Sequence, residues 1–195
     1  DPVSSTPLKE GTGDINKDKD TPVATDPAVK YREHVEIAFG GLPTTLDPYQ
    51  KTNNVHDTTF KLSHNQLIYY NYETAEFEPE LAAEWKTEAA DTYWFKLKQG
   101  VKFHNGEELK ASDVKFTLER AAESSFTSDK MSWNESIETP DDYTVILKLT
   151  EPVQDILNFL SDRTLSIVNE KAVTEDPENG PGVGCGPYKL REWVL

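Results

Sequence analysis

The sequence predicts a mixed α/β fold. Segments with the alternating apolar pattern of half-buried strands are interleaved with segments that have the period of an amphipathic helix. The 195 residues are 36% hydrophobic and 10% aromatic, which is enough apolar material to bury one core of domain size. The chain has a single cysteine, so no disulfide can form within it.

The first thirty residues differ in composition from the rest. Asp, Lys, Thr, Pro and Gly dominate, no aromatic residue occurs, and the apolar residues show no period. Such a segment cannot bury enough apolar area to offset the entropy lost on ordering. We therefore expect residues 1–30 to be a flexible acidic linker.

The folded part is expected to open with a strand, His34–Phe39, in which polar and apolar residues alternate. Leu46–Tyr49 predicts a turn, because an aspartate precedes a proline that fixes φ. A helix is then predicted from Asp57, which can cap it, to about Tyr70, because apolar residues recur at the helical period.

A β-hairpin is predicted next, with strands Trp85–Thr87 and Thr92–Lys98 joined by a short connection. In the second strand three large side chains share one face: Tyr93, Phe95 and Leu97. An amphipathic helix should then start at Lys110 or Ser112 and run to Ala122. Its apolar side carries Val114, Leu118 and Ala121.

The last third of the chain predicts shorter elements. Asp141 and Asp142 indicate a turn before an apolar strand. The expected elements are a strand at Tyr143–Leu149, a short helix at Ile156–Leu160, a strand at Leu165–Val168, a Pro/Gly loop at Asp176–Gly184 and a final strand at Gly186–Val194.

The charge excludes some classes of partner. The net charge of −15 argues against nucleic acid, whose phosphates must be met by clustered Lys and Arg, and against an anionic membrane surface. No apolar run reaches the roughly 18–20 residues that a membrane-spanning helix needs. A soluble protein that is secreted or held at the cell surface fits this balance.

Candidate catalytic residues are few. Cys185 lies between two glycines, but a nucleophile elbow needs glycine at the positions that Val183 and Pro187 occupy, so a packing role is expected for the thiol. The four histidines are dispersed and form no zinc motif; His104, in Phe-His-Asn-Gly, is expected to be a turn residue bonded to backbone. The sequence thus predicts that the protein is not an enzyme and that it holds no metal and no cofactor.

Five short motifs occur in order along the folded part. They are Thr45-Leu46-Asp47-Pro48, Pro79-Glu80-Leu81-Ala82-Ala83-Glu84-Trp85, Phe95 through Gly106, Ala111 through Phe116, and Gly184-Cys185-Gly186-Pro187-Tyr188. Each is weak alone, but in this order they resemble the family 5 extracellular solute-binding proteins of bacterial ABC importers, the oligopeptide- and dipeptide-binding lipoproteins. One departure is Lys110, which stands where the family usually has a threonine as helix cap.

The resemblance implies a particular version of the α/β fold, a mixed-sheet lobe of the type II periplasmic-binding-protein fold. Residues 31–50 and 164–195 would form the core sheet of lobe I, and residues 51–163 an inserted α+β subdomain. Family members are much longer than this chain, so a second lobe would be absent from it. Residues 1–30 are similar to the segment that follows the lipid-anchored cysteine of such lipoproteins.

The resemblance also implies a function. The intact protein would capture di- and oligopeptides between two lobes by strand-like backbone hydrogen bonds and deliver them to the transmembrane subunits of an ABC permease. It would act as a monomer in the periplasm or on the extracellular side of the cytoplasmic membrane, held only by a lipid anchor outside this chain. The alternatives are a ligand such as a nickel complex, haem or a sugar, or a cell-surface interaction module without a transport role.

The ligand-contacting residues expected from the resemblance come from three segments. They are Gly41, Leu42, Pro43, Thr44, Phe126, Met131, Trp133, Cys185 and Gly186. Phe126, Met131 and Trp133 lie in a polar segment, Ser124–Asn134, that we expect to be a loop or broken helix; their alternative role is a small satellite cluster of apolar side chains.

Overall fold

The computed structural model describes residues 45–50 and 54–192, all of which belong to one compact unit that runs from Phe39 to Leu195. Within them lie four α-helices: α1 (Asn54–Ser63), α2 (Ala111–Glu123), α3 (Ile156–Leu160) and α4 (Glu170–Glu175). Four 3₁₀ turns accompany them, at Pro48–Gln50, Ser128–Met131, Arg163–Leu165 and Gly180–Gly182. None of these described helices is long and apolar enough to cross a membrane. The predicted strand His34–Phe39 lies outside the described residues.

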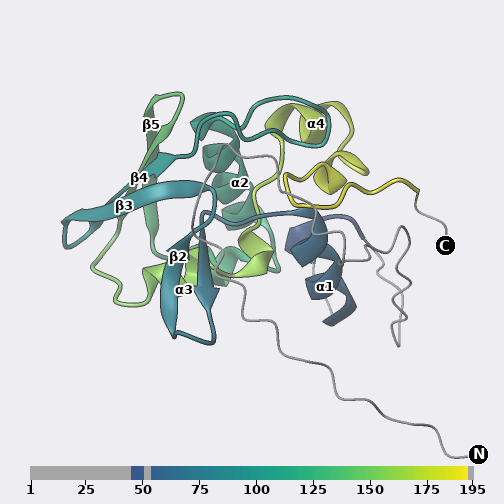
Figure 1. Cartoon of the computed structure of the whole chain (residues 1–195). Coiled ribbons are helices and arrows are strands. Elements are labelled where there is room, and N and C mark those ends of the chain that lie inside the picture. Colours follow the sequence, from purple (N-terminus) through teal and green to yellow (C-terminus); the bar gives the residue numbers. More distant parts are fainter. Residues whose placement is uncertain (1–44, 51–53, 193–195) are drawn as a thin grey trace, which may run out of the picture. The chain divides into compact units, whose positions relative to one another are not determined.

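The strands form two antiparallel sheets (Figure 1). A two-stranded sheet pairs β1 (Ile68–Asn71) with β2 (Glu76–Pro79). A four-stranded sheet has the order β3-β4-β6-β5. Its strands are β3 (Ala82–Ala89), β4 (Thr92–Leu97), β5 (Asn134–Asp141) and β6 (Thr144–Leu149).

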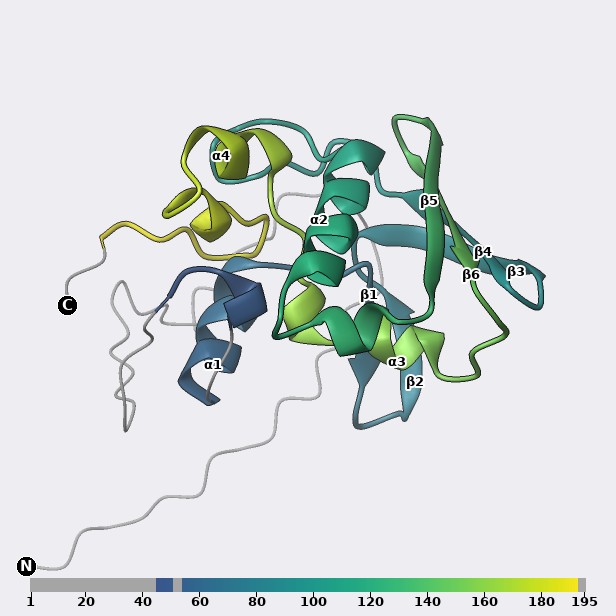
Figure 2. The ribbon, with the colours of Figure 1, turned by 180° about the vertical axis from the view of Figure 1, so that it is seen from behind.

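Helix α2 packs against the four-stranded sheet, and its buried side chains are part of the hydrophobic core. It contacts β5 and β6 on one side and α4 on another, as Figure 2 shows from behind. The apolar stripe predicted for this helix is confirmed, since Val114, Leu118 and Ala121 are all buried. The inward face of β4 is confirmed as well, with Phe95 and Leu97 in the same core cluster.

The start of α2 also joins two distant parts of the chain. Its N-cap, Lys110, is extended, and the Lys110 N–H donates to Asp113 Oδ2 at 2.9 Å. The other oxygen of Asp113 accepts from Glu170 N at 2.9 Å and from Asn169 Nδ2 at 3.2 Å. One buried carboxylate thus fixes the start of α2 and the start of α4 together. It accepts hydrogen bonds from a backbone N–H at the beginning of each helix, where no partner within the helix exists.

One predicted helix ends earlier in the structure than expected. The helix expected to reach Tyr70 ends at Ser63, and Ile68–Asn71 is a strand. The side chain of Ser63 donates to Thr59 O, which favours termination. The run Ile-Tyr-Tyr after it has the β-branched and aromatic residues of a strand and pairs with β2.

Two strands expected in the C-terminal part of the chain are not strands in the structure. Leu165–Val168 is no strand: a 3₁₀ turn ends at Leu165, held by Asp162 Oδ1, which accepts from Thr164 N at 2.8 Å. Gly186–Glu192, the described part of the expected last strand, is irregular. The boundaries of the predicted core sheet and inserted subdomain therefore stay a prediction.

An ion pair secures the Leu-Asp-Pro motif to α2. The carboxylate of Asp47 faces the guanidinium of Arg120 in a two-point contact, with Nη1 to Oδ1 at 3.1 Å. The Arg120 guanidinium also lies 4.6 Å from the centre of the Tyr49 ring, whose hydroxyl donates to Thr117 O at 2.7 Å. Burial raises the pKa of Tyr49 well above its usual range, so this hydroxyl stays a donor.

We expect Asp47→Asn to lower the free energy of unfolding by about 2 kcal/mol, because it leaves the half-buried Arg120 without its counter-charge. Urea unfolding at neutral pH measures this. The matched control is Glu119→Gln, which removes a carboxylate 3.7 Å from Lys115 on the exposed side of the same helix and should change stability by less than about 0.5 kcal/mol. Equal losses in the two variants would contradict a specific role for the Asp47 pair.

Candidate functional site

The Gly184–Cys185–Gly186 segment is held between two distant parts of the chain. On one side, Gly186 N donates to Ser63 O and Tyr188 N to Leu62 O, both at 2.9 Å, at the end of α1. On the other side, His104 N donates to Gly184 O, and His104 Nε2 donates to Gly186 O, each at 2.9 Å. The expectation that His104 is a turn residue bonded to backbone is confirmed.

Both glycines are required by this close approach. A Cβ on Gly184 would lie 2.0 Å from Ser63 O, and one on Gly186 would lie 2.5 Å from Ser63 C. Real Cβ atoms do not approach backbone this closely, so any other residue would push the segment off the end of α1. The Gly-x-Gly pattern therefore encodes backbone contact with α1.

The thiol of Cys185 faces inward. It packs against the core, and burial raises its pKa to about 12, so it is a neutral thiol at physiological pH. A thiol is a poor nucleophile until it ionises, which gives the structure no support for a catalytic Cys185. The packing role expected from the sequence agrees with this geometry.

The peptide group of Cys185 is different from those of its neighbours. The residue is partly exposed although its side chain packs inward. Along residues 45–50 and 54–192, no backbone group of another residue bonds to the Cys185 N–H or C=O. The flanking carbonyls, by contrast, are both taken by His104. One donor and one acceptor, rigidly held at both ends, are therefore left for an extended partner.

His64 binds the chain shortly before this segment, at Pro181. Its ring is buried, with Nε2 donating to Pro181 O at 2.8 Å and Nδ1 lying 2.8 Å from Ser63 Oγ. Burial lowers the pKa of His64 to about 4, so the ring is neutral at pH 7 and this tautomer persists. The sequence offered no signal for this role, because His64 and Pro181 are 117 residues apart.

A hollow of about 190 Å³ borders the segment, with a mainly apolar lining. Leu46, Phe60, Gly182, Tyr188 and Leu190 are among the residues that form it. The predicted site residues Gly41, Leu42, Pro43 and Thr44 lie outside the described part of the chain. Leu46 follows these residues closely in the sequence. It lies near Gly182, because a Cβ added to Gly182 would lie 3.1 Å from Leu46 Cδ1.

The three predicted contact residues from the polar segment do not share one environment. Phe126 is 59% exposed, whereas Met131 and Trp133 are buried. Both buried side chains belong to the main core cluster, so they form no satellite. Ligand contact by these residues stays a prediction; for Met131 and Trp133 it would require the core to open.

Metal ligands do not gather in the described part. Across residues 45–50 and 54–192, no group of three or more His, Cys, Asp or Glu could hold a metal ion. The hollow and the segment beside it present backbone groups and a mainly apolar lining.

Comparison with known proteins identifies a matching family. Residues 76–195 match the family described as bacterial extracellular solute-binding proteins, family 5, middle. The Probable D,D-dipeptide-binding periplasmic protein DdpA of Escherichia coli K12 is 29% identical over 164 residues, which cover 77% of this chain and 32% of the relative. The glutathione-binding protein GsiB of Escherichia coli O157:H7 is 30% identical over 166 residues, 82% of this chain and 32% of the relative.

Solved structures confirm the predicted fold class. The binding protein AgaA from A. tumefaciens R10, in complex with agropinic acid, superposes with a TM-score of 0.72 at 31% identity, over 79% of this chain and 32% of that one. DppA from Helicobacter pylori, in complex with the peptide STSA, gives 0.69 at 27% identity, over 77% and 35%. This chain spans about a third of the length of the relatives it matches, so it corresponds to part of one periplasmic-binding-type protein.

Proposed function

This chain belongs to the bacterial extracellular solute-binding proteins of family 5, and from that premise we propose that it is part of a protein that binds peptides for an ABC importer. Relatives in the family are binding proteins of transporters rather than enzymes. The single observation that carries the proposal is the peptide group of Cys185, a partly exposed residue between two fixed glycines, to which no backbone group of another described residue bonds.

Such a peptide group suits a ligand that is itself a peptide. A main chain lying along Gly184–Gly186 would donate one N–H to Cys185 O and accept from Cys185 N, as neighbouring strands do. Backbone pairing gives affinity without reading side chains, and the apolar hollow beside Tyr188 and Leu190 would then receive a side chain of the ligand. Gly41–Thr44, just before Leu46, would line the same place.

The names of the relatives favour this ligand class. They include binders of a D,D-dipeptide, of glutathione and of the peptide STSA. Agropinic acid, the ligand of AgaA, is the exception, so other small carboxylic acids are the second candidate class. In either case we propose that the whole protein is extracellular or periplasmic, lipid-anchored at its N-terminus, monomeric, and docks onto the transmembrane subunits of a permease.

This chain alone is expected to bind peptides weakly, with a dissociation constant well above ~1 μM. Tight pockets bury roughly 70–90% of a ligand, and one lobe covers much less while the association cost of ~4–15 kcal/mol stays the same. Titration of the ¹⁵N-labelled 195-residue chain with a pool of di- to pentapeptides measures this. The amide signals of Gly184, Cys185 and Gly186 should move, because they flank the pairing site.

Two comparisons sharpen the test. Cys185→Ala should keep the affinity within about threefold, since the proposed contact uses backbone atoms and not the thiol. Replacing an amide of the responding peptide by an ester should weaken binding at least ~5-fold, the cost of one lost hydrogen bond. Binding that depends on the thiol, or that leaves the three amide signals unmoved, would contradict the assignment of this segment.

A further inference from the structure

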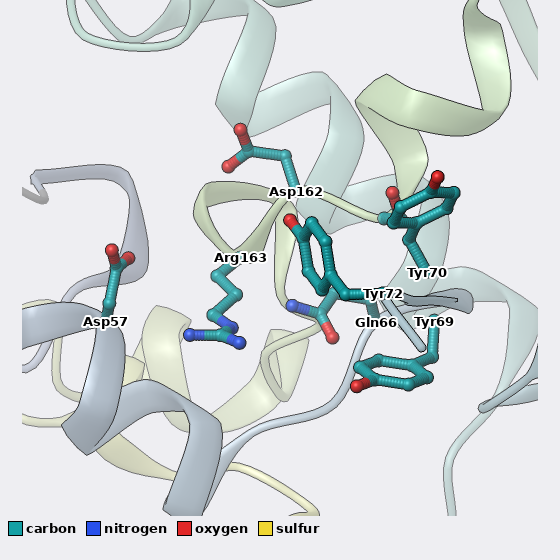
Figure 3. Close-up of a pocket in the computed structure, with 8 residues that line it drawn as sticks. Asp57, Gln66, Tyr69, Tyr70, Tyr72, Asp162 and Arg163 are labelled. Atoms are coloured by element: carbon teal, nitrogen blue, oxygen red, sulfur yellow. The ribbon is translucent and has the colours of Figure 1, made fainter. Parts of the chain in front are cut away.

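A second pocket opens at the β1–β2 hairpin and shares no lining residue with the hollow beside Gly184–Gly186. Its volume is about 190 Å³, and Figure 3 shows its side chains. They come from three places in the chain: α1, the hairpin, and the turn after α3. The lining consists of Asp57, Gln66, Tyr69, Tyr70, Tyr72, Ser161, Asp162 and Arg163.

Gln66 supplies an unused amide inside this pocket. Its backbone is fixed, because Gln66 N donates to Glu80 Oε2 at 2.7 Å and Gln66 O accepts from Leu81 N at 3.1 Å. The residue is only 6% exposed, yet no residue in the described part of the chain hydrogen-bonds to its side-chain amide. Figure 3 shows that amide pointing into the pocket. The amide faces the open space of the pocket, so a ligand with a donor and an acceptor can bond to it in place of water.

Arg163 brings a positive charge to the same space. Its side chain is partly buried and takes part in none of the ion pairs between described residues. Two acidic groups close to it have other hydrogen-bond partners. The Glu80 carboxylate, which Arg163 attracts electrostatically, accepts from Asn65 Nδ2 and Gln66 N, both at 2.7 Å. Asp162 pairs with Lys130 and bonds to Thr164, and in Figure 3 its carboxylate points away from the guanidinium. The planar fork of an arginine that forms no ion pair with another described residue matches a carboxylate.

The tyrosines form a fixed aromatic wall. Tyr72 is 80% exposed, but its ring meets Tyr70 edge-on at 5.0 Å between centroids and 88° between planes. Tyr70 in turn contacts Phe77 at 5.1 Å, and Phe77 packs against the core. The edge-on contact favours one orientation of the exposed ring, which reduces the entropy cost of stacking on it.

We propose that this pocket binds the α-carboxylate end of an amino acid or peptide. Arg163 takes the carboxylate, the Gln66 amide bonds to the adjoining peptide or amino group, and the tyrosine wall covers the side chain. The volume is smaller than the roughly 300–1,000 Å³ of pockets for drug-sized ligands, so one residue fits and a long peptide does not. The site is independent of the function proposed above, because the two places share no residues.

The two sources of such a carboxylate differ in their amino group. A free amino acid carries an ammonium, which the carboxylate of Asp57 at the edge of the pocket would attract in addition to its existing contacts. A peptide C-terminus carries a neutral amide instead. Comparing L-alanine with N-acetyl-L-alanine therefore separates the two sources, while N-acetyl-L-alanine amide tests the need for the carboxylate.

NMR titration of the 195-residue chain up to ~10 mM of each compound follows the Gln66 side-chain amide and the Tyr72 ring signals. At least one of the two acids should shift both the Gln66 amide signals and the Tyr72 ring signals. N-acetyl-L-alanine amide should bind at least ~10-fold more weakly than that acid, because it lacks the charge that Arg163 recognises. Tighter binding of L-alanine identifies free amino acids as the ligand class; equal or tighter binding of the acetylated acid identifies peptide ends.

Three variants complete the test. Arg163→Gln should weaken binding of the two acids at least ~10-fold. Tyr72→Ala changes only an exposed ring and should weaken their binding a few-fold without affecting the fold. Arg191→Gln, at an exposed arginine elsewhere, should leave binding unchanged. The proposal is overturned if neither acid moves these signals, if the amide compound binds equally well, or if Arg163→Gln retains full affinity while folded.

Discussion

Gly184→Ala is expected to destabilise the protein by about 3 kcal/mol or more. The added Cβ would lie 2.0 Å from Ser63 O, a backbone atom at the end of α1 that cannot turn aside. Forcing a methyl group into filled space typically costs 1–3 kcal/mol, and more when backbone must move. Urea unfolding of the variant should show a lower midpoint with an unchanged slope.

Gly182→Ala is the matched control for this change, two residues away in the same segment. The nearest atoms to its Cβ would all belong to the Leu46 side chain, Cδ1 at 3.1 Å and Cβ at 3.3 Å, and a shift of a few tenths of an ångström relieves contacts of this length. We expect a loss below about 1 kcal/mol. Equal losses at the two positions would show that the contact between Gly184 and α1 is not what the segment requires.

Acidification should destabilise the protein by about 3 kcal/mol through His64 alone. The folded state holds the pKa of this histidine at about 4, below its usual 6.5, because the ring is buried. The unfolded chain therefore binds the proton first as the pH falls. Stability from this group is complete above pH 6.5 and is lost progressively as the pH falls from 6.5 to 4.

The comparison with His64→Gln isolates this effect. A glutamine can still donate to Pro181 O but cannot titrate, so the variant should lose about 3 kcal/mol less than the unchanged protein between pH 7 and pH 4. The difference is needed because other groups titrate too: hydrogen bonds lower the pKa of Glu108 to about 2, whereas burial raises the pKa of Glu80. Parallel pH profiles for the two proteins would contradict the assignment.

Local pattern was enough to predict much of the fold. The helix expected to end at Ala122 is found at Ala111–Glu123, and the predicted strand Thr92–Lys98 is found at Thr92–Leu97, because each has a clear apolar period along its own sequence. Strand β5, with the sequence Asn-Glu-Ser-Ile-Glu-Thr-Pro-Asp, was not predicted. It contains one buried apolar residue, Ile137, and owes its place to pairing with β6.

The site was predictable only to the extent that it is local. The Gly-Cys-Gly motif located the segment, but nothing near it in sequence identifies what fixes it. Gly186 bonds to His104 and to Ser63, which lie 82 and 186 − 63 = 123 positions earlier, and the nearby Pro181 bonds to His64, 117 positions earlier. The second pocket depends on the same kind of long-range proximity, since Gln66 and Arg163 have no common motif.

The outer strands of the four-stranded sheet bear on how the protein resists aggregation. Among the described residues, β3 and β5 each pair with a strand on one side only. Both carry carboxylates, β5 contains Pro140, and each has an irregular register against its neighbour. Two copies that met edge to edge would bring these like charges together, in a chain whose net charge is already −15. The protection requires ionised carboxylates, so colloidal solubility should fall in acid, where His64 also favours unfolding.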